Sequence, residues 1–172
     1  TKRFGNWLEY ANDWNLSRSR FWGIPLPIWR NNKGDQTKVI GSVSELISEI
    51  NLSINNGLMS TNPIKDFKIN DLSELNYNKI DLHKDTVDNI ILSDSNGKPM
   101  YREKDLIDVW FDSGAMPYAQ WHYPFENKDK IDKNKSFPAD YIAEGIDQTR
   151  GWFYTLHAIS TLVFNNISYK NV

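Results

Sequence analysis

The chain has 172 residues, of which 40% are hydrophobic and 24% charged, as expected for about one soluble globular domain. It contains no cysteine, which excludes disulfides and thiolate metal sites and fits a reducing, cytoplasmic location. A net charge of −2 gives no whole-chain attraction to nucleic acid, and no apolar run approaches the roughly 18 residues that a membrane span needs.

Charge and tryptophan content divide the chain into three segments, residues 1–30, 31–105 and 106–172. The first holds five basic against two acidic side chains, the second nine against twelve, and the third six against eight. Four of the seven tryptophans lie in the first segment, three in the last and none in the middle. We therefore expect two aromatic core segments separated by a more polar inserted lobe.

The first segment contains the run RFWGIPLPIWR. Pro25 and Pro27 each lack a backbone donor, so residues 23–29 are predicted to be an extended edge segment and not a central strand. Trp22 and Trp29 are expected to anchor this segment in a core. The functional alternative is that the arginines just before it face an anion such as phosphate.

The middle segment begins with a predicted helix, GSVSELISEINLSINNG. Ser42 can cap its N-terminus, and Glu45 can complete a capping box. Apolar residues recur at helical spacing along one stripe, and Gly57 after two asparagines is a suitable C-terminal stop. We expect this helix to have a structural role.

A hairpin is predicted later in the same segment. Asn96 and Gly97 suit a type I′ turn between strands near residues 87–93 and 99–104. No residue of this hairpin indicates chemistry, so its expected role is also structural.

The last segment opens with DLIDVWFDSG, which we interpret as a core strand ending at a site. In a strand, Asp108, Trp110 and Asp112 share one face, while Val109 and Phe111 share the other. The alternative is that Asp112 merely caps a following turn or helix. Two aspartates could also form a glycosidase pair or a Mg²⁺ site, although a carboxylate pair without partners is a weak signal.

A second strand, ending near Glu144, is predicted to lead into a helix in the run AEGIDQTRGWFYTLHAIS. Asp147 is the expected N-cap, and an apolar stripe follows at helical spacing, made up of Trp152, Leu156, Ile159 and Val163. The polar residues thus lie at a strand-to-helix turn, where α/β folds place their ligands. The alternative is a capped core helix in which Trp152 is simply buried.

This turn has the features of a binding surface for a ligand with one polar and one apolar end. Gly145 lets a ligand approach the backbone without meeting a Cβ. Gln148 and Trp152 are four residues apart, which places an amide and an indole on one helix face.

Three stretches, NLSRSRFWGIPLPIW, DVWFDSG and EGIDQTRGWF, resemble in this order the class I aminoacyl-tRNA synthetases, and among them the isoleucyl-tRNA synthetases. The resemblance spans almost the whole chain, and the third stretch best separates it from the valyl and leucyl relatives. It implies an α/β fold, namely the second half of a Rossmann-like catalytic domain carrying a mixed helix and hairpin lobe at 31–105. Residues 1–30 would return the chain from the editing domain, and residues 106–172 would form the catalytic half.

The resemblance also implies an activity and a set of site residues. The family joins isoleucine and ATP into isoleucyl-adenylate, releases pyrophosphate, and transfers the isoleucyl group to tRNA(Ile). The residues that match its adenylate site are Glu144, Gly145, Asp147 and Gln148. Those that match the walls of its isoleucine side-chain pocket are Trp110 and Trp152.

Much of the family's machinery is missing from this sequence. It has no His-Ile-Gly-His-type segment and no Lys-Met-Ser-Lys-Ser-type loop, which handle ATP phosphates and Mg²⁺ in the family. The chain is therefore expected to be an inactive piece of a longer, cytoplasmic and monomeric enzyme, with no catalytic residue, metal or bound cofactor of its own. The alternatives are an aromatic-rich carbohydrate-binding domain and a protein-interaction module using the Pro25 and Pro27 segment.

Overall fold

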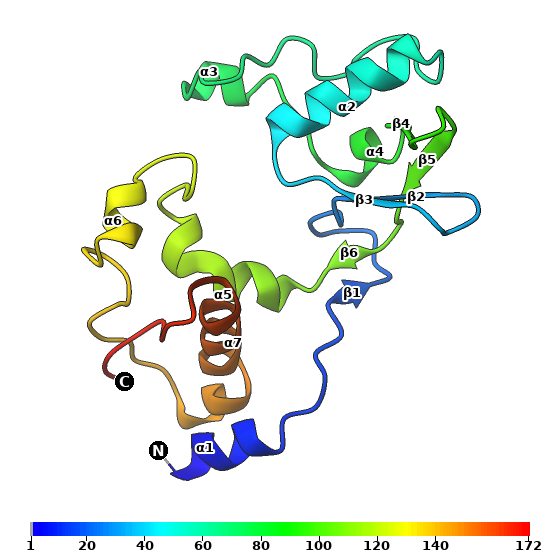
Figure 1. Cartoon of the computed structure of the whole chain (residues 1–172). Helices are drawn as coiled ribbons and strands as arrows, with labels where there is room; N and C mark the ends of the chain where they lie inside the picture. Colours follow the sequence, from blue (N-terminus) through cyan, green and yellow to red (C-terminus); the bar gives the residue numbers. More distant parts are fainter. Residues whose placement is uncertain (1) are drawn as a thin grey trace. The chain divides into compact units, whose positions relative to one another are not determined.

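The computed structural model describes residues 2–172, which form a mixed α/β structure of two compact units. The sheet unit is the continuous segment Ser17–Ile107. The helical unit joins the chain up to Leu16 with Asp108–Val172. The chain therefore passes between the units at two points, 16/17 and 107/108 (Figure 1). The division expected from composition, at 30/31 and 105/106, stays a prediction.

The sheet unit is built on antiparallel strands. Its four-stranded sheet has the order β3-β2-β5-β4, and a separate pair joins β1 to β6. Three helices complete the unit (Figure 1). The strands are β1 Ser17–Arg18, β2 Ile28–Asn31, β3 Thr37–Val39, β4 Leu92–Ser93, β5 Pro99–Arg102 and β6 Leu106–Ile107; the helices are α2 Val43–Asn55, α3 Glu74–Tyr77 and α4 Lys84–Val87.

The core of the sheet unit lies between α2 and the sheet. Leu46 and Ile50 on the buried stripe of α2 belong to one apolar cluster with Trp29, Leu92 and Met100 from three strands. The indole of Trp29 is buried and donates a hydrogen bond to the carbonyl of Ile90 at 2.8 Å. A buried tryptophan with a satisfied N–H adds a large apolar area without an orphaned polar atom.

The predicted helix at α2 is confirmed, together with both of its ends. The Ser42 hydroxyl accepts from the backbone N–H of Glu45 at 3.1 Å, and the Glu45 carboxylate accepts from the N–H of Gly41 at 2.8 Å. Gly57 has φ +72°, and the N–H of Leu58 donates to the carbonyl of Ser53. This is the pattern of a Schellman C-cap, in which glycine takes the left-handed position.

The predicted hairpin exists but differs in its turn. Strands β4 and β5 pair antiparallel, whereas residues 84–87 form α4 and not the start of a strand. Gly97 has φ +73°, but Asn96 is not among the residues with positive φ, so the turn is not type I′. The amide of Asp94 instead donates to the carbonyl of Lys98 at 2.8 Å, closing a three-residue loop that ends in a left-handed glycine.

The edge-segment prediction for residues 23–29 is wrong at its C-terminal end. Strand β2, which contains Trp29, lies between β3 and β5 and is therefore a central strand. Pro25 and Pro27 precede β2, so they remove no hydrogen bond from its ladder. Of the two expected anchors, Trp29 is buried, but Trp22 is 77% exposed.

The helical unit is organised around the pair α5 and α7, which pack against each other (Figure 1). Gly114 allows their close approach, because a Cβ there would lie 2.7 Å from Cδ1 of Ile159 and 3.0 Å from the carbonyl oxygen of Thr155. A short 3₁₀ helix, η1, precedes α7 and contacts α1. The elements are α1 Lys2–Glu9, α5 Val109–Ala119, α6 Lys128–Asp132, η1 Ile146–Arg150 and α7 Trp152–Phe164.

Both core strands predicted for the last segment are wrong. Strand β6 ends at Ile107, and Asp108 caps α5, so Trp110 and Asp112 lie on a helix. Residues 140–145 form no strand, and the single parallel bridge joins Ala139 to Tyr169. Residues 168–171 lie beside this segment, but their hydrogen bonds to Ala139 and Ile142 do not extend into a ladder. Within residues 2–172 the named strands pair only antiparallel.

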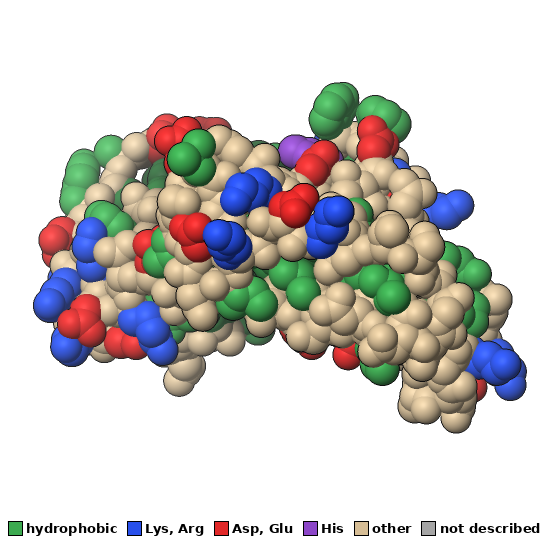
Figure 2. Space-filling model, turned by 90° about the horizontal axis from the view of Figure 1, so that it is seen from above, with side chains coloured by type: hydrophobic (Ala, Val, Ile, Leu, Met, Phe, Trp, Pro, Cys, Tyr) green, Lys and Arg blue, Asp and Glu red, His purple; other side chains and the backbone are tan. Residues whose placement is uncertain are grey.

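Charges of both signs are interspersed on the face of the molecule in Figure 2, as the near-balanced sequence leads one to expect. In the described part of the chain, no helix is both long and apolar enough to cross a membrane.

Candidate functional site

Asp108 connects the start of α5 with the N-terminal segment of the helical unit. Its carboxylate accepts a hydrogen bond from Nε1 of Trp14 at 3.0 Å and another from the backbone N–H of Trp110 at 3.2 Å. Its own N–H donates to the carbonyl of Leu16 at 2.8 Å. The residue is 3% exposed, and a buried carboxylate is tolerated only when its oxygens are paired in this way.

The start of α7 is fixed by a side chain from the turn before it. The Gln148 Oε1 accepts from the backbone N–H of Trp152 at 2.8 Å, and its Nε2 donates to a carboxylate oxygen of Asp147 at 3.1 Å. The N-cap position is Gly151, so the expectation that Asp147 caps this helix is wrong. The chain turns through η1 first, and Gln148 provides the acceptor that a capping aspartate would otherwise supply.

Trp110 and Trp152 stand in the first turns of the two packed helices. The indole N–H of Trp152 donates to the carbonyl of Ser113 in α5 at 3.1 Å, which ties the start of α7 to α5. Trp152 is half-buried, whereas Trp110 is 43% exposed. An exposed indole beside this packed helix pair is a surface that a small apolar group can cover.

Trp110 also lines a cavity of about 310 Å³ in the helical unit. The Arg150 guanidinium lies 5.0 Å from the ring centre of Trp7, in the range of a cation–π contact. Tyr154 packs on both Trp7 and Trp14. The remaining lining residues are Asn12, Asp13, Gly151 and Thr155.

Glu144, which precedes η1 in the sequence, lines a different cavity of about 510 Å³. Arg3 and His157 line it as well, with an otherwise mainly apolar wall that includes Phe4 and Phe153. Among the six residues expected at the site, the structure thus joins Asp147, Gln148 and Trp152 by hydrogen bonds and assigns Trp110 and Glu144 to separate cavities. Gly145 is next to this group, since a Cβ there would collide with the Asp147 carboxylate.

The geometry does not favour the alternative roles of Asp108 and Asp112. Asp108 is engaged by Trp14 and Trp110, so its carboxylate is not available to a sugar or a metal. Burial and, second, the charge of Asp108 raise the pKa of Asp112. Over residues 2–172, no group of three or more His, Asp or Glu side chains is arranged to hold a metal ion.

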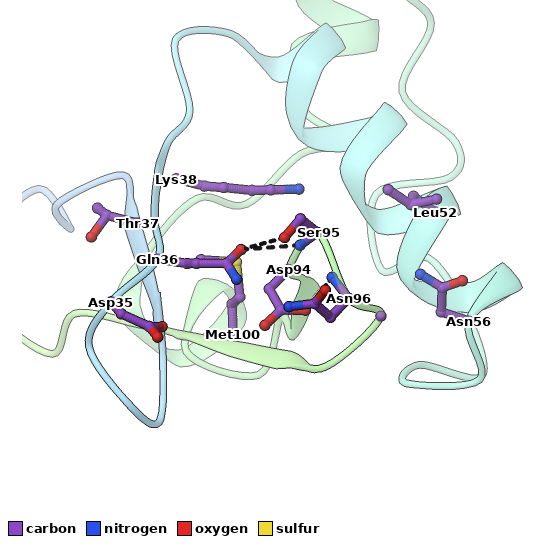
Figure 3. A pocket seen from close by; sticks show the side chains of 11 residues that line it. Asp35, Gln36, Thr37, Lys38, Leu52, Asn56, Asp94, Ser95, Asn96 and Met100 are labelled. Atoms are coloured by element: carbon purple, nitrogen blue, oxygen red, sulfur yellow. Dashed lines mark hydrogen bonds between the residues drawn. The ribbon is translucent and has the colours of Figure 1, made fainter.

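A further cavity, of about 790 Å³, lies in the sheet unit beside the 94–98 loop (Figure 3). The Gln36 Oε1 accepts from both the N–H and the hydroxyl of Ser95, at 3.1 and 2.9 Å. Hydrogen bonds from the N–H of Lys98 foremost, and also of Asn96, lower the pKa of Asp94. These polar side chains mainly hold the loop, which accounts for their concentration here.

Sequence patterns alone do not identify Trp7, Trp14, Arg150 and Tyr154 as cavity residues. They come from α1, the segment after it and the η1–α7 turn, so no periodic pattern connects them. The sequence does contain a signal for the cap at Asp108. An aspartate N-cap with a second acidic residue, Asp112, about one turn later is typical of a helix N-terminus.

Comparison with known proteins gives a family match along the entire chain. The family described as tRNA synthetases class I (I, L, M and V) matches residues 1–172. The chain belongs to the class I tRNA synthetases. Its membership leaves the carbohydrate-binding and interaction-module alternatives without support.

Three relatives of this class I synthetase chain are named as isoleucine–tRNA ligases. It is 63% identical over 174 residues to an isoleucine–tRNA ligase of Bacteroides fragilis and 59% identical over 172 residues to that of Porphyromonas gingivalis. It is 43% identical over 174 residues to a probable cytoplasmic isoleucine–tRNA ligase of Dictyostelium discoideum. These alignments cover 99–100% of the chain but only 14–15% of each relative, so the chain corresponds to a small part of those proteins.

Proposed function

We propose that this chain is part of an isoleucine–tRNA ligase. The enzyme joins isoleucine to ATP, releases pyrophosphate, and transfers the isoleucyl group from the adenylate to tRNA(Ile). The observation that carries the proposal is identity of 63% to such a ligase over the full chain. The discriminating stretch EGIDQTRGWF forms the η1–α7 turn that holds Trp152.

In this proposal the helical unit supplies the second half of a Rossmann-like catalytic domain. The relatives are several times longer than this chain, so other segments of the parent enzyme would complete a parallel sheet next to residues 139–145. Residues 31–105 form the inserted lobe, and residues 1–30 lead the chain back from an editing domain. The antiparallel sheet of the lobe takes its central strand, β2, mainly from the end of the segment that leads into it.

The isoleucine side chain would lie against Trp110 and Trp152. The adenylate's polar atoms would be met by Glu144, by the Asp147 carboxylate and by the backbone at Gly145. Gln148 has a different role from the one its position first suggests, because both ends of its amide are engaged. It connects Asp147 to the backbone of Trp152 at the start of α7, so the polar and apolar parts of the proposed site keep a fixed position relative to each other. The chemistry is then positioning and charge stabilisation, not covalent catalysis.

ATP and tRNA(Ile) are substrates of the proposed parent enzyme, which we take to be a cytoplasmic monomer. The relative from Dictyostelium discoideum is named as a probable cytoplasmic enzyme, which supports this location. Mg²⁺ accompanies ATP in this family, but the described residues lack a three-carboxylate or histidine cluster that fits a metal. No step of the proposal is therefore routed through a metal on this chain.

The proposal is tested on the full-length synthetase that contains this chain, by amino-acid-dependent exchange between ATP and pyrophosphate. Isoleucine should support exchange best. Valine should follow by a factor of about 10–200, the limit that one methylene group sets and for which isoleucyl enzymes are themselves the known example. Leucine or methionine as the preferred substrate would contradict the proposal and place the chain elsewhere in the same family.

A further inference from the structure

We propose that Trp14 is a positioning residue for the isoleucine pocket and that it acts on Trp110 through the carboxylate of Asp108. This inference rests on the proposed function for the identity of the ligand. Trp14 lies 94 positions before Asp108 in the sequence, so its contact is made only in the folded helical unit.

The Asp108 carboxylate accepts hydrogen bonds from two donors on different segments of the helical unit. One oxygen accepts from the Trp14 indole at 3.0 Å, and the other accepts from the Trp110 amide at 3.2 Å. The amide of Trp110 is one of the orphan N–H groups at the start of α5, where an aspartate N-cap is most effective. The orientation of the carboxylate therefore determines the position of the Trp110 backbone.

The carboxylate of Asp108 is also shielded from water. Asp108 is 3% exposed, so water cannot readily replace the indole donor if it is lost. Hydrogen bonds to charged groups are also stronger than those between neutral groups. Removing the Trp14 N–H should therefore reorient the carboxylate and loosen the first turn of α5.

Trp110 itself stands in the first turn of α5. Its side chain is 43% exposed, so the backbone of α5 largely determines its direction. The ring of Trp14 shares the 310 Å³ cavity with Trp110 and packs on Tyr154. A substitution that keeps an aromatic ring at position 14 but removes the donor separates packing from positioning.

The decisive variant is Trp14→Phe in the full-length synthetase, with Trp121→Phe as its matched control. The Nε1 of Trp121 is buried without a hydrogen-bond partner, so the control removes an indole N–H that holds nothing. For Trp14→Phe we expect the KM for isoleucine to rise about 5- to 20-fold, which is less than the roughly 10- to 150-fold of a full hydrogen bond to a charged group, because the effect reaches the pocket indirectly. The KM for ATP should change less than twofold in both variants.

A second variant shows whether Trp14 acts through Asp108. In Asp108→Asn the side chain keeps one acceptor oxygen but turns an amide toward the other donor. It should raise the KM for isoleucine, and adding Trp14→Phe should then have little further effect, because both changes break one connection. Independent, multiplicative effects would overturn the inference, as would a Trp14→Phe variant that behaves like the Trp121→Phe control. If Trp14→Phe does not fold, Asp108→Asn alone must still raise the isoleucine KM relative to ATP.

Hydrogen exchange separates failure of this inference from failure of the proposed function. The Trp110 amide in the full-length protein should exchange about 5- to 20-fold faster in Trp14→Phe than in wild type or Trp121→Phe. Unchanged exchange overturns the positioning role whatever the substrate is. A wild-type enzyme that does not activate isoleucine refutes the proposed function, and with it the ligand assigned here, while the exchange rates still decide how Trp14 acts on α5.

Discussion

Trp152 combines a structural contact with a proposed contact to substrate. Its indole N–H reaches α5 at Ser113, while its ring belongs to the proposed side-chain pocket. Trp152→Ala in the full-length enzyme should weaken isoleucine binding by about 2–4 kcal/mol, somewhat less than the truncation of a fully buried tryptophan costs, because this ring is half-buried. If the ring contacts isoleucine equally in the ground and transition states, this loss appears mainly in the KM for isoleucine and hardly in that for ATP.

Steady-state kinetics alongside a thermal melt distinguish this from a purely structural role. Trp22→Ala is the control, because that indole is 77% exposed and should leave both constants unchanged. A Trp152→Ala enzyme that merely melts early, with both substrates equally affected, would show that the residue belongs to the core and not to the pocket.

Gly114 is the residue at which the packing of α5 on α7 has least room. A methyl group there would contact the Ile159 side chain at 2.7 Å and the Thr155 backbone at 3.0 Å, and the backbone cannot move away cheaply. Gly114→Ala should lower the free energy of unfolding by about 1–3 kcal/mol, despite the better helix propensity of alanine. Denaturant unfolding of the 172-residue chain measures this.

The matched control is Gly5→Ala in α1, where a Cβ would have nothing within 4 Å. Alanine is favoured over glycine in a helix by about 0.5–1 kcal/mol, so this change should stabilise α1. Equal effects of the two substitutions would mean that the α5–α7 contact is looser than described.

Among the helices and strands, sequence patterns correctly predicted those whose ends are determined by nearby residues. The α2 helix was identified because its apolar stripe, its Ser42–Glu45 cap and its Gly57 stop all agree. The prediction around Trp110 is wrong because alternation over five residues fits a strand as well as the first turn of a helix, and the bond from the Trp110 N–H to Asp108 shows that the helix forms. Residues 140–145 have strand-like composition, but their contact with the C-terminal segment, in which the Ile142 N–H donates to the Asn171 carbonyl at 3.0 Å, is too short to form a strand ladder. The extent of pairing cannot be inferred from composition.

An ion pair between two elements of the sheet unit gives a pH-dependent prediction. Arg102 in β5 is almost fully buried and contacts the carboxylate of Asp88, which follows α4. Burial acts to raise the pKa of Asp88, but hydrogen bonds and charge from Lys84 and Arg102 outweigh it, and the net pKa is lowered. The carboxylate therefore stabilises the fold above its unfolded pKa of about 4, and that stability is lost as the pH falls through the lower folded pKa.

Asp88→Asn should reduce the free energy of unfolding by about 2–3 kcal/mol at neutral pH, since it leaves a buried guanidinium without its counter-charge. The difference from wild type should shrink below about pH 4, where the wild-type carboxylate is itself protonated in the unfolded state. Urea unfolding of the chain at pH 7, 5 and 3 tests this. A deficit that is the same at all three values would show that charge is not the cause.

For the whole molecule, the sequence supported the family and the chemistry more firmly than the architecture. Three motifs in a fixed order are enough to identify the family, because a motif is a local sequence pattern that can be recognised without knowing the fold. The two units could not be drawn from composition, since residues 17–30 resemble the aromatic segments but join the sheet through β2 and its neighbours. Long-range contacts, not local content, decide to which unit such a segment belongs.

The purified 172-residue chain should not catalyse isoleucine-dependent exchange between ATP and pyrophosphate. Its sequence lacks the two motifs that handle ATP phosphates in the family, and positioning of isoleucine alone does not activate it. The full-length enzyme in the same assay is the positive control. Exchange by the short chain above a no-enzyme blank would mean that phosphate-binding groups have been overlooked in it.

The pairing of β1 with β6 has a thermodynamic consequence for the chain on either side. Ser17 lies opposite Ile107, and next to this pair the amide of Asp108 donates to the carbonyl of Leu16. Bringing together the ends of a flexible loop of about 90 residues would cost about 4 kcal/mol in chain entropy. Strand pairing within the sheet unit offsets that entropy. The loops inside the unit can therefore lengthen or shorten in evolution without changing the hydrogen bond between Trp14 and Asp108.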